Sequence, residues 1–113
     1  MDRIHDLTKA ILDVFTNYAD YLYGGHKSTV EYDIIADEHN HRYQLVAVGW
    51  EQNNRIFYVI FQADIIDGKI WIQADNTEDG LAALLEEKGI SKSDIVLAYF
   101  PEYHRKYTAY AVE

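Results

Sequence analysis

Two aspartates and a lysine that are close together in the sequence are the residue types needed for metal-dependent cleavage of a phosphodiester. They are Asp64, Asp67 and Lys69. In metal-dependent nucleases, acids hold Mg²⁺ and a lysine steadies the attacked phosphate. However, Asp67 is followed by glycine between two β-branched runs, which is the pattern of a two-residue hairpin turn. Nuclease acids converge from different strands, so we interpret this group as a turn and not as a nuclease site.

A second group contains histidines. His39 and His41 are two positions apart, and Asp37 is in register with them on an extended chain. Two imidazoles and a carboxylate are suitable ligands for Zn²⁺ or Ni²⁺. The segment is also a charged turn, where short motifs often match by chance. His39 and His41 are therefore weak metal candidates, and we expect no cofactor.

Candidates for covalent catalysis are missing. The chain has 0 cysteines, which excludes disulfides, thiolate metal sites and a cysteine nucleophile. None of the serines has the glycine neighbours of a nucleophile elbow. We therefore predict that the protein is not an enzyme, with a metal-dependent hydrolase at the histidine turn as the remaining enzymatic alternative.

One compact basic cluster spans residues 104–106 and is flanked by tyrosines. Arginine beside aromatic rings can bind a carboxylate or a phosphate, although such a cluster also balances local acid. The chain has 2 Trp, 10 Tyr and 4 Phe, more than a small core usually needs, and Trp and Tyr are frequent in binding hot spots. The candidate partner-binding residues are Trp50, Tyr103, Arg105, Lys106 and Tyr107.

The charge balance indicates the kind of partner. With 10 Lys plus Arg against 19 Asp plus Glu, the formal net charge is -9 and the pI is about 4.8. Such a surface repels phosphate, because affinity for nucleic acid depends on displacing counterions with Lys and Arg. A basic protein partner is favoured, and direct nucleic-acid binding through Arg105 and Lys106 is the alternative.

At 113 residues we expect a single domain, residues 1–113, without a membrane span and in the cytoplasm. The apolar spacing of residues 4–22 predicts an amphipathic helix that lies on a sheet. We expect Asp2 to cap this helix, and the helix to end near Tyr23, before Gly24 and Gly25.

The next segments have the period of strands. We predict strands over residues 28–35, 43–50 and 55–65, followed by a hairpin turn at 67–68 and a fourth strand. Residues 56–61 are apolar on both faces, so this strand is either covered on both sides in the middle of a sheet or faces an oligomer interface. A homo-oligomer is therefore a second candidate partner.

The last part of the chain returns to helix and strand. A second helix is expected over residues 77–88, capped by Asp75 with Glu78 and ended by Gly89. A strand over 95–100, a turn or short helix over 102–106 and a short strand over 107–112 follow. The predicted fold class is α+β: an N-terminal helix, a four-stranded antiparallel meander, a second helix, and one or two further strands.

Motifs along nearly the whole chain resemble one family. They are YQLV at 43–46, VGW at 48–50, DI at 64–65, DGKIWIQ at 67–73, Asp75, TE at 77–78, Gly80, Lys92, DIVL at 94–97, RKYT at 105–108 and AV at 111–112. On these residues the chain resembles the XisI family, the fdxN element excision controlling factors of filamentous nitrogen-fixing cyanobacteria.

The resemblance implies an accessory role in site-specific DNA excision. In that family a separate serine recombinase performs the chemistry, and XisI acts together with XisH, a partner that itself looks like an endonuclease. The resemblance transfers no catalytic residue. It implies a XisH-like partner, contact with DNA only through partners, and, as a narrower alternative, an acidic inhibitor of a nuclease-like partner.

Overall fold

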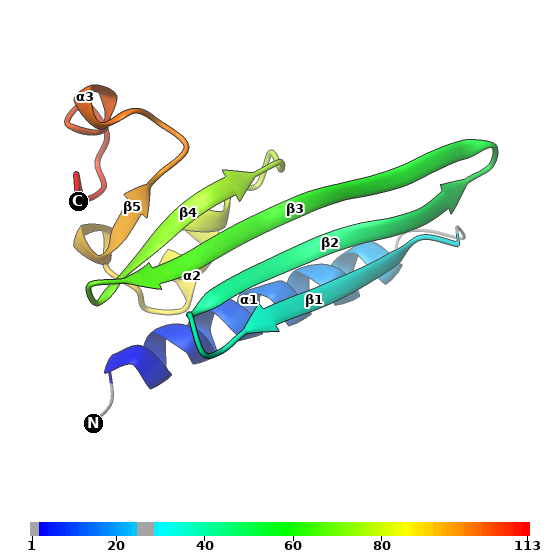
Figure 1. The fold of residues 1–113 in the computed structure, drawn as a ribbon, viewed down its shortest axis with the longest axis horizontal. Helices are drawn as coiled ribbons and strands as arrows, with labels where there is room; N and C mark the ends of the chain where they lie inside the picture. Colours follow the sequence, from blue (N-terminus) through cyan, green and yellow to red (C-terminus); the bar gives the residue numbers. More distant parts are fainter. Residues whose placement is uncertain (1–2, 25–28) are drawn as a thin grey trace.

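The computed structural model describes residues 3–24 and 29–113, and Figure 1 shows a sheet with a long helix along one face. The sheet has 5 strands in the spatial order β1-β2-β3-β4-β5. Neighbours from β1 to β4 are antiparallel, which confirms the predicted meander, and β5 is parallel to β4. The elements are α1 (Arg3–Gly24), β1 (Glu31–Asp37), β2 (Arg42–Glu51), β3 (Asn54–Ile66), β4 (Lys69–Asp75), α2 (Leu81–Glu87), η1 (Lys92–Asp94), β5 (Ile95–Leu97) and α3 (Glu102–Arg105).

Helix α1 covers one face of the sheet, which we call the inner face. Its side chains Leu7, Ile11 and Phe15 are fully buried, and burial of each contributes about 2 kcal/mol. The Phe15 ring stacks on that of Phe61 in β3, with centroids 5.6 Å apart. The predicted amphipathic helix and its end near residue 24 are confirmed. The expected cap at Asp2 lies outside the described residues.

The predicted hairpin turn between β3 and β4 is confirmed. Asp67 and Gly68 have φ values of 50° and 76°, the positive angles that this tight turn needs. The first strand is displaced from its predicted range of 28–35, because β1 begins at Glu31 and its pairing with β2 continues to Asp37. Residue 28 lies outside the described ranges.

The second helix begins later than predicted, at Leu81 instead of residue 77. The Asp75 carboxylate accepts the Leu81 N–H at 2.8 Å and the Thr77 N–H and hydroxyl at 3.1 and 2.7 Å. These bonds fold the intervening residues into a loop, so that no helical turn forms there. Glu78 accepts none of them and is exposed. Gly89, at φ 91°, ends the helix as predicted.

The C-terminal strands are shorter than predicted. Strand β5 ends at Leu97, because the Phe100 N–H turns back to the Leu97 carbonyl at 3.2 Å. Residues 107–112 form turns with one bridge between Ala111 and Val96, so the predicted strand there is wrong. The Thr108 hydroxyl accounts for this, since it bonds the backbone on both sides and competes with a ladder. The predicted short helix over 102–106 is confirmed as α3.

Strand β3 is central, but it is not covered on both faces along its length. Strand β4 pairs only with residues 61–66 of β3, so the part near the β2–β3 turn extends beyond it. There Phe57 and Tyr58 are 69% and 48% exposed. The prediction that both faces of residues 56–61 are covered is therefore wrong, among the described residues, for the first half of this segment.

Candidate protein-binding surface

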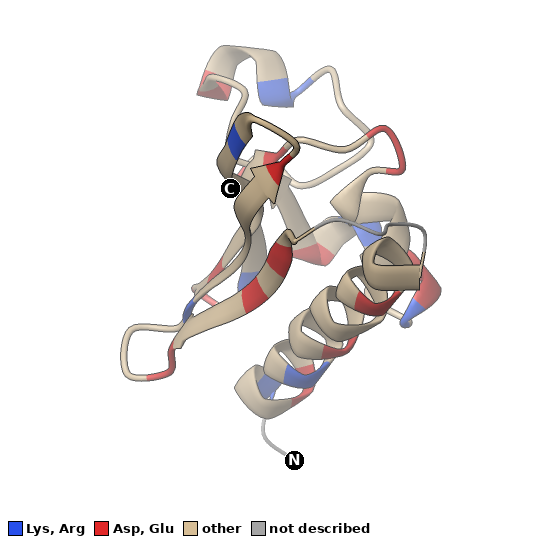
Figure 2. Ribbon diagram, turned by 90° about the vertical axis from the view of Figure 1, so that its right-hand side faces the viewer, with Lys and Arg blue, Asp and Glu red and all other residues tan. Residues whose placement is uncertain are grey.

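The face of the sheet opposite α1, the outer face, has no described helix over β1 to β3. Figures 1 and 2 show α1 against one side of these strands only. Val46 is buried yet lies outside the main core cluster, because its side chain is on this outer face. We give the name open sheet surface to the apolar and amide side chains of this area together with Arg55. From the strand register these are Ile35, Gln44, Val46, Val48, Trp50, Arg55, Phe57, Val59 and Gln62, and Glu31 and Asp33 of β1 lie on the same face beside them.

The end of the open sheet surface near the β2–β3 turn is aromatic. Trp50 and Phe57 come from neighbouring strands and are 50% and 69% exposed. The Arg55 guanidinium lies over both rings, 5.5 Å from the Trp50 centroid and 5.8 Å from that of Phe57. Two exposed rings that share one cation form a contact area that is both apolar and charged, a composition typical of interface hot spots.

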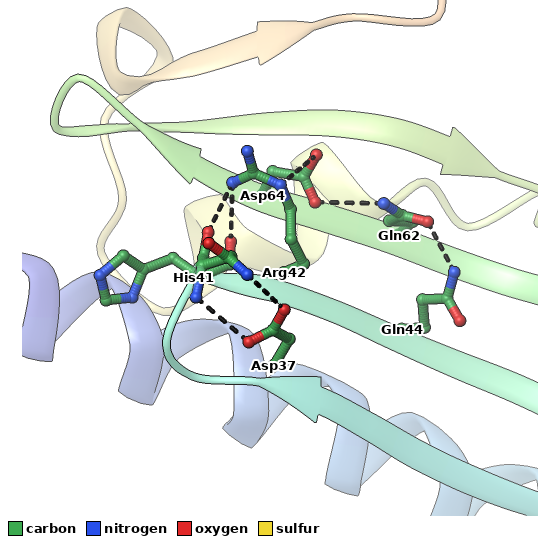
Figure 3. A network of polar contacts seen from close by, with 7 residues as sticks. Asp37, His41, Arg42, Gln44, Gln62 and Asp64 are labelled. Carbon is green, nitrogen blue, oxygen red and sulfur yellow. Dashed lines mark hydrogen bonds and ion pairs between the residues drawn. The ribbon is translucent and has the colours of Figure 1, made fainter.

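The other end of the open sheet surface is polar. Figure 3 shows a chain of contacts in which Gln44 donates to Gln62 at 2.7 Å and Gln62 donates to Asp64 at 3.2 Å. The other Asp64 oxygen lies 3.6 Å from the Arg42 Nε. Asp64 is only 5% exposed, and a buried carboxylate needs such partners. Asp64 therefore has a structural role in this network.

The predicted basic cluster divides into residues with different roles. Arg105 is half-buried, with its guanidinium 5.3 Å from the Trp71 ring centroid. Its Nε donates to the Phe100 carbonyl at 3.0 Å and its Nη1 to the Val112 carbonyl at 3.4 Å. Arg105 therefore holds the C-terminal segment over β4, which leaves its side chain less free for a partner.

The remaining candidates at α3 are on the surface. Tyr103 and Tyr107 are 75% and 76% exposed, and the Lys106 Nζ lies 5.2 Å from the Tyr107 ring centroid. The structure brings these residues together with Arg105, but not with Trp50. Trp50 is at the end of the β2–β3 hairpin, at the opposite end of the molecule from α3 (Figure 1).

The histidine turn does not bring His39, His41 and Asp37 together as three ligands. His41 has a positive φ of 57°, and its ring points away from Asp37 (Figure 3). The Asp37 carboxylate instead accepts the side-chain and backbone N–H groups of Asn40 at 2.8 and 3.2 Å, which lowers its pKa. Within residues 3–24 and 29–113, no three His, Cys, Asp or Glu side chains are grouped closely enough to hold a metal ion.

A hollow of about 480 Å³ lies between α1 and α2, lined by Val14, Asn17, Tyr18, Tyr21, Asp79, Leu84, Glu87 and Lys88. The Tyr18 hydroxyl donates to Asp79 at 3.0 Å, and burial together with this bond raises the pKa of Tyr18 to about 12. Tyr18 thus stays neutral over the ordinary pH range and ties α1 to the loop before α2. The hydrogen bond between Tyr18 and Asp79 stabilises the fold, so this role accounts for both side chains without a bound ligand.

The sequence did not single out most of the open sheet surface. Apolar residues such as Val46 and Val48 are as common in cores as at interfaces, so only the strand pairing shows that their face lacks a cover. Trp50 was the one member that sequence reasoning identified. In the sequence, the strand period over residues 43–50 places Gln44, Val46 and Val48 on the same face as Trp50, and this is the one signal for them.

These features define a small α+β fold with an exposed aromatic sheet surface. Each helix of the described residues is too short or too polar to span a bilayer. The crystal structure of a XisI-like protein from Anabaena variabilis is 34% identical, with a TM-score of 0.85 over 97% of this chain and 99% of that one. That of the fdxN element excision controlling factor XisI from Anabaena variabilis is 28% identical, with a TM-score of 0.79 over 99% and 100%.

The family described as XisI protein matches residues 1–112. This chain belongs to the XisI family, and its mixed α+β sheet is the fold of the two Anabaena structures. No protein with a curated description matches it.

Proposed function

We propose that this chain is a controlling factor that acts by binding another protein and performs no reaction itself. The observation that carries the proposal is the open sheet surface, where Trp50 and Phe57 are half-exposed or more beside apolar neighbours. Adjoining apolar side chains that include Trp mark protein interfaces. The name of the 28% identical relative, an excision controlling factor, supports the same class of role.

The proposed partner is a XisH-like protein of endonuclease-like character, and the proposed process is site-specific excision of a DNA element in the cytoplasm. The net charge of -9 supports contact with DNA through the partner, because a surface of this charge repels phosphate. In a narrower form of the proposal, the chain restrains the partner as an acidic inhibitor. Cells that express the partner alone should then grow poorly and recover when this chain is co-expressed. Equal growth in both cases would contradict restraint.

Co-purification tests the proposal. A tagged chain, co-expressed with a XisH-like protein from the same genome, should retain that protein on the affinity resin. The double variant Trp50→Ala, Phe57→Ala should lose it, because it removes the two large exposed rings of the open sheet surface. The matched control is Tyr103→Ala, Tyr107→Ala, which removes two exposed rings at α3. If the wild-type chain retains no XisH-like protein, the proposal is wrong.

The control also separates the two groups of candidate residues. Loss of the partner from the Tyr103→Ala, Tyr107→Ala variant alone would move the binding site to α3 and Lys106. Loss from the Trp50→Ala, Phe57→Ala variant alone would place it on the open sheet surface. Circular dichroism of both variants checks that the fold is retained.

A further inference from the structure

Among the described strands, β1 is an edge strand, because it pairs with β2 alone and has no strand on its other side. The Tyr32 N–H points away from β2 and donates to the hydroxyl of Tyr23 on α1 at 2.7 Å. Backbone N–H groups alternate sides along an antiparallel strand, so those of Ile34 and Ala36 point the same way. No described residue pairs with them. Tyr23 thus binds the outward N–H at the start of the strand, and the outward N–H groups of Ile34 and Ala36 are left available.

Two features that often protect an edge strand, a proline or lysine and a bulge, are missing from β1, so its acidic side chains are the main barrier to a further strand. Its sequence EYDIIAD contains no proline and no lysine, and its register with β2 is continuous without a bulge. Ile34 and Ile35 follow one another, on opposite faces of the sheet, and are 38% and 53% exposed. An added strand would therefore find both free backbone groups and apolar side chains at this place.

The charges on β1 indicate what such a strand carries. Glu31, Asp33 and Asp37 alternate along its outer face. Glu31 and Asp33 form no ion pair within the described residues. A second copy that paired through its own β1 would bring acids against the same acids, which is unfavourable between neighbouring strands. A chain of net charge -9 also repels its own copies at long range. Charge complementarity favours a basic segment.

We propose that the free edge of β1 receives an extended basic segment of the partner protein, which adds to the sheet as a further strand. In this arrangement Lys or Arg side chains of the segment lie beside Glu31 and Asp33 on the outer face, and apolar side chains lie beside Ile34 on the inner face. The inference rests on the proposed protein-binding role and specifies where and how the partner binds.

A labelled peptide in which lysine alternates with valine tests the site directly by fluorescence anisotropy with the full chain. Ile34→Pro removes an outward N–H without removing a bond to β2, and proline is tolerated on edge strands. We expect this variant to weaken peptide binding about tenfold, the equivalent of one or two net hydrogen bonds. The same peptide with alternate amides methylated should not bind. If Ile34→Pro binds the unmodified peptide as tightly as wild type, the edge is not the site.

A second pair of variants tests the charge without affecting the backbone. Glu31→Gln, Asp33→Asn should weaken binding to a similar extent. The matched control, Asp6→Asn, Asp20→Asn, removes the same charge from exposed positions on α1 and should change affinity by less than about twofold, because screening limits charges at a distance. Equal weakening by both pairs would show attraction by net charge alone and would overturn the proposal.

Failure of this inference is distinguishable from failure of the proposed function. If a XisH-like protein co-purifies equally with wild type and Ile34→Pro, the β1 site is wrong although the function stands. If the peptide binds as expected but no XisH-like protein is retained, the site stands and the named partner is wrong. A wild-type dimer in light scattering that Ile34→Pro converts to a monomer would overturn the assignment in favour of a second copy.

Discussion

Replacing Arg105 by alanine should destabilise the protein, because this side chain fastens the C-terminal segment to the sheet. Its hydrogen bond to the Phe100 carbonyl, at 3.0 Å, has a charged donor, and such bonds contribute about 1.5–3 kcal/mol. Stacking on Trp71 at 5.3 Å adds about 0.5–1 kcal/mol at a partly exposed site. The bond to Val112, at 3.4 Å, is long and adds little. Because the side chain is only half-buried, we expect a loss near the lower limit, about 2 kcal/mol.

Urea unfolding followed by circular dichroism measures this loss, and a thermal scan should show a midpoint lower by roughly 8 °C. Lys106→Ala is the matched control, since it removes the adjacent cation. The Lys106 side chain is exposed and lies 5.2 Å from the Tyr107 ring centroid, so its removal should cost at most about 0.5 kcal/mol. Equal effects of the two variants would refute the structural role of Arg105 and return it to the candidate binding residues.

Other substitutions test the local structure and its pH dependence. Asp75→Ala should cost about 2 kcal/mol in urea unfolding, because its carboxylate holds the α2 N-terminus at Leu81, while Glu78→Ala should cost under about 0.5 kcal/mol; equal losses would support the predicted capping box instead. Gly49→Ala should cost at least about 2 kcal/mol, because the added Cβ would lie 2.5 Å from the Thr29 carbonyl oxygen; a normal midpoint would contradict that close approach. Burial raises the pKa of Tyr18 from 10.0 to about 12, because the folded protein favours the neutral phenol. The stability gained in this way is fully present below pH 10 and is lost as the pH rises to 12. Tyr18→Phe should lose less stability than wild type over that interval, and parallel curves would contradict the raised pKa.

Strong local patterns were enough to predict the elements that form the framework. The apolar stripe of α1 and the Asp67-Gly68 turn depend on residues close in sequence, so their structure follows from spacing and backbone preference. The predicted start of α2 is wrong. The sequence spacing indicates that a capping carboxylate precedes the helix, but it does not indicate how many loop residues separate that carboxylate from the first helical residue. Asp75 reaches Leu81 across residues that the pattern assigned to the helix.

The candidate site was less predictable, because it depends on contacts between distant parts of the chain. Arg105 has the sequence context of a free basic residue, and only the packing of α3 over β4 shows that Trp71 lies beneath it. Ile34 has the pattern of an ordinary strand residue. Its place on an unpaired edge follows from the order of all the strands in the sheet, which no local pattern encodes.

We propose that this XisI-family chain works by binding another protein. Size-exclusion chromatography with light scattering, on the purified chain mixed with a purified XisH-like protein in the absence of DNA, tests it most directly. We predict one peak whose mass equals that of a complex, and separate peaks when the Trp50→Ala, Phe57→Ala variant replaces the wild type. Separate peaks of unchanged mass for the wild-type chain would contradict binding of the XisH-like protein.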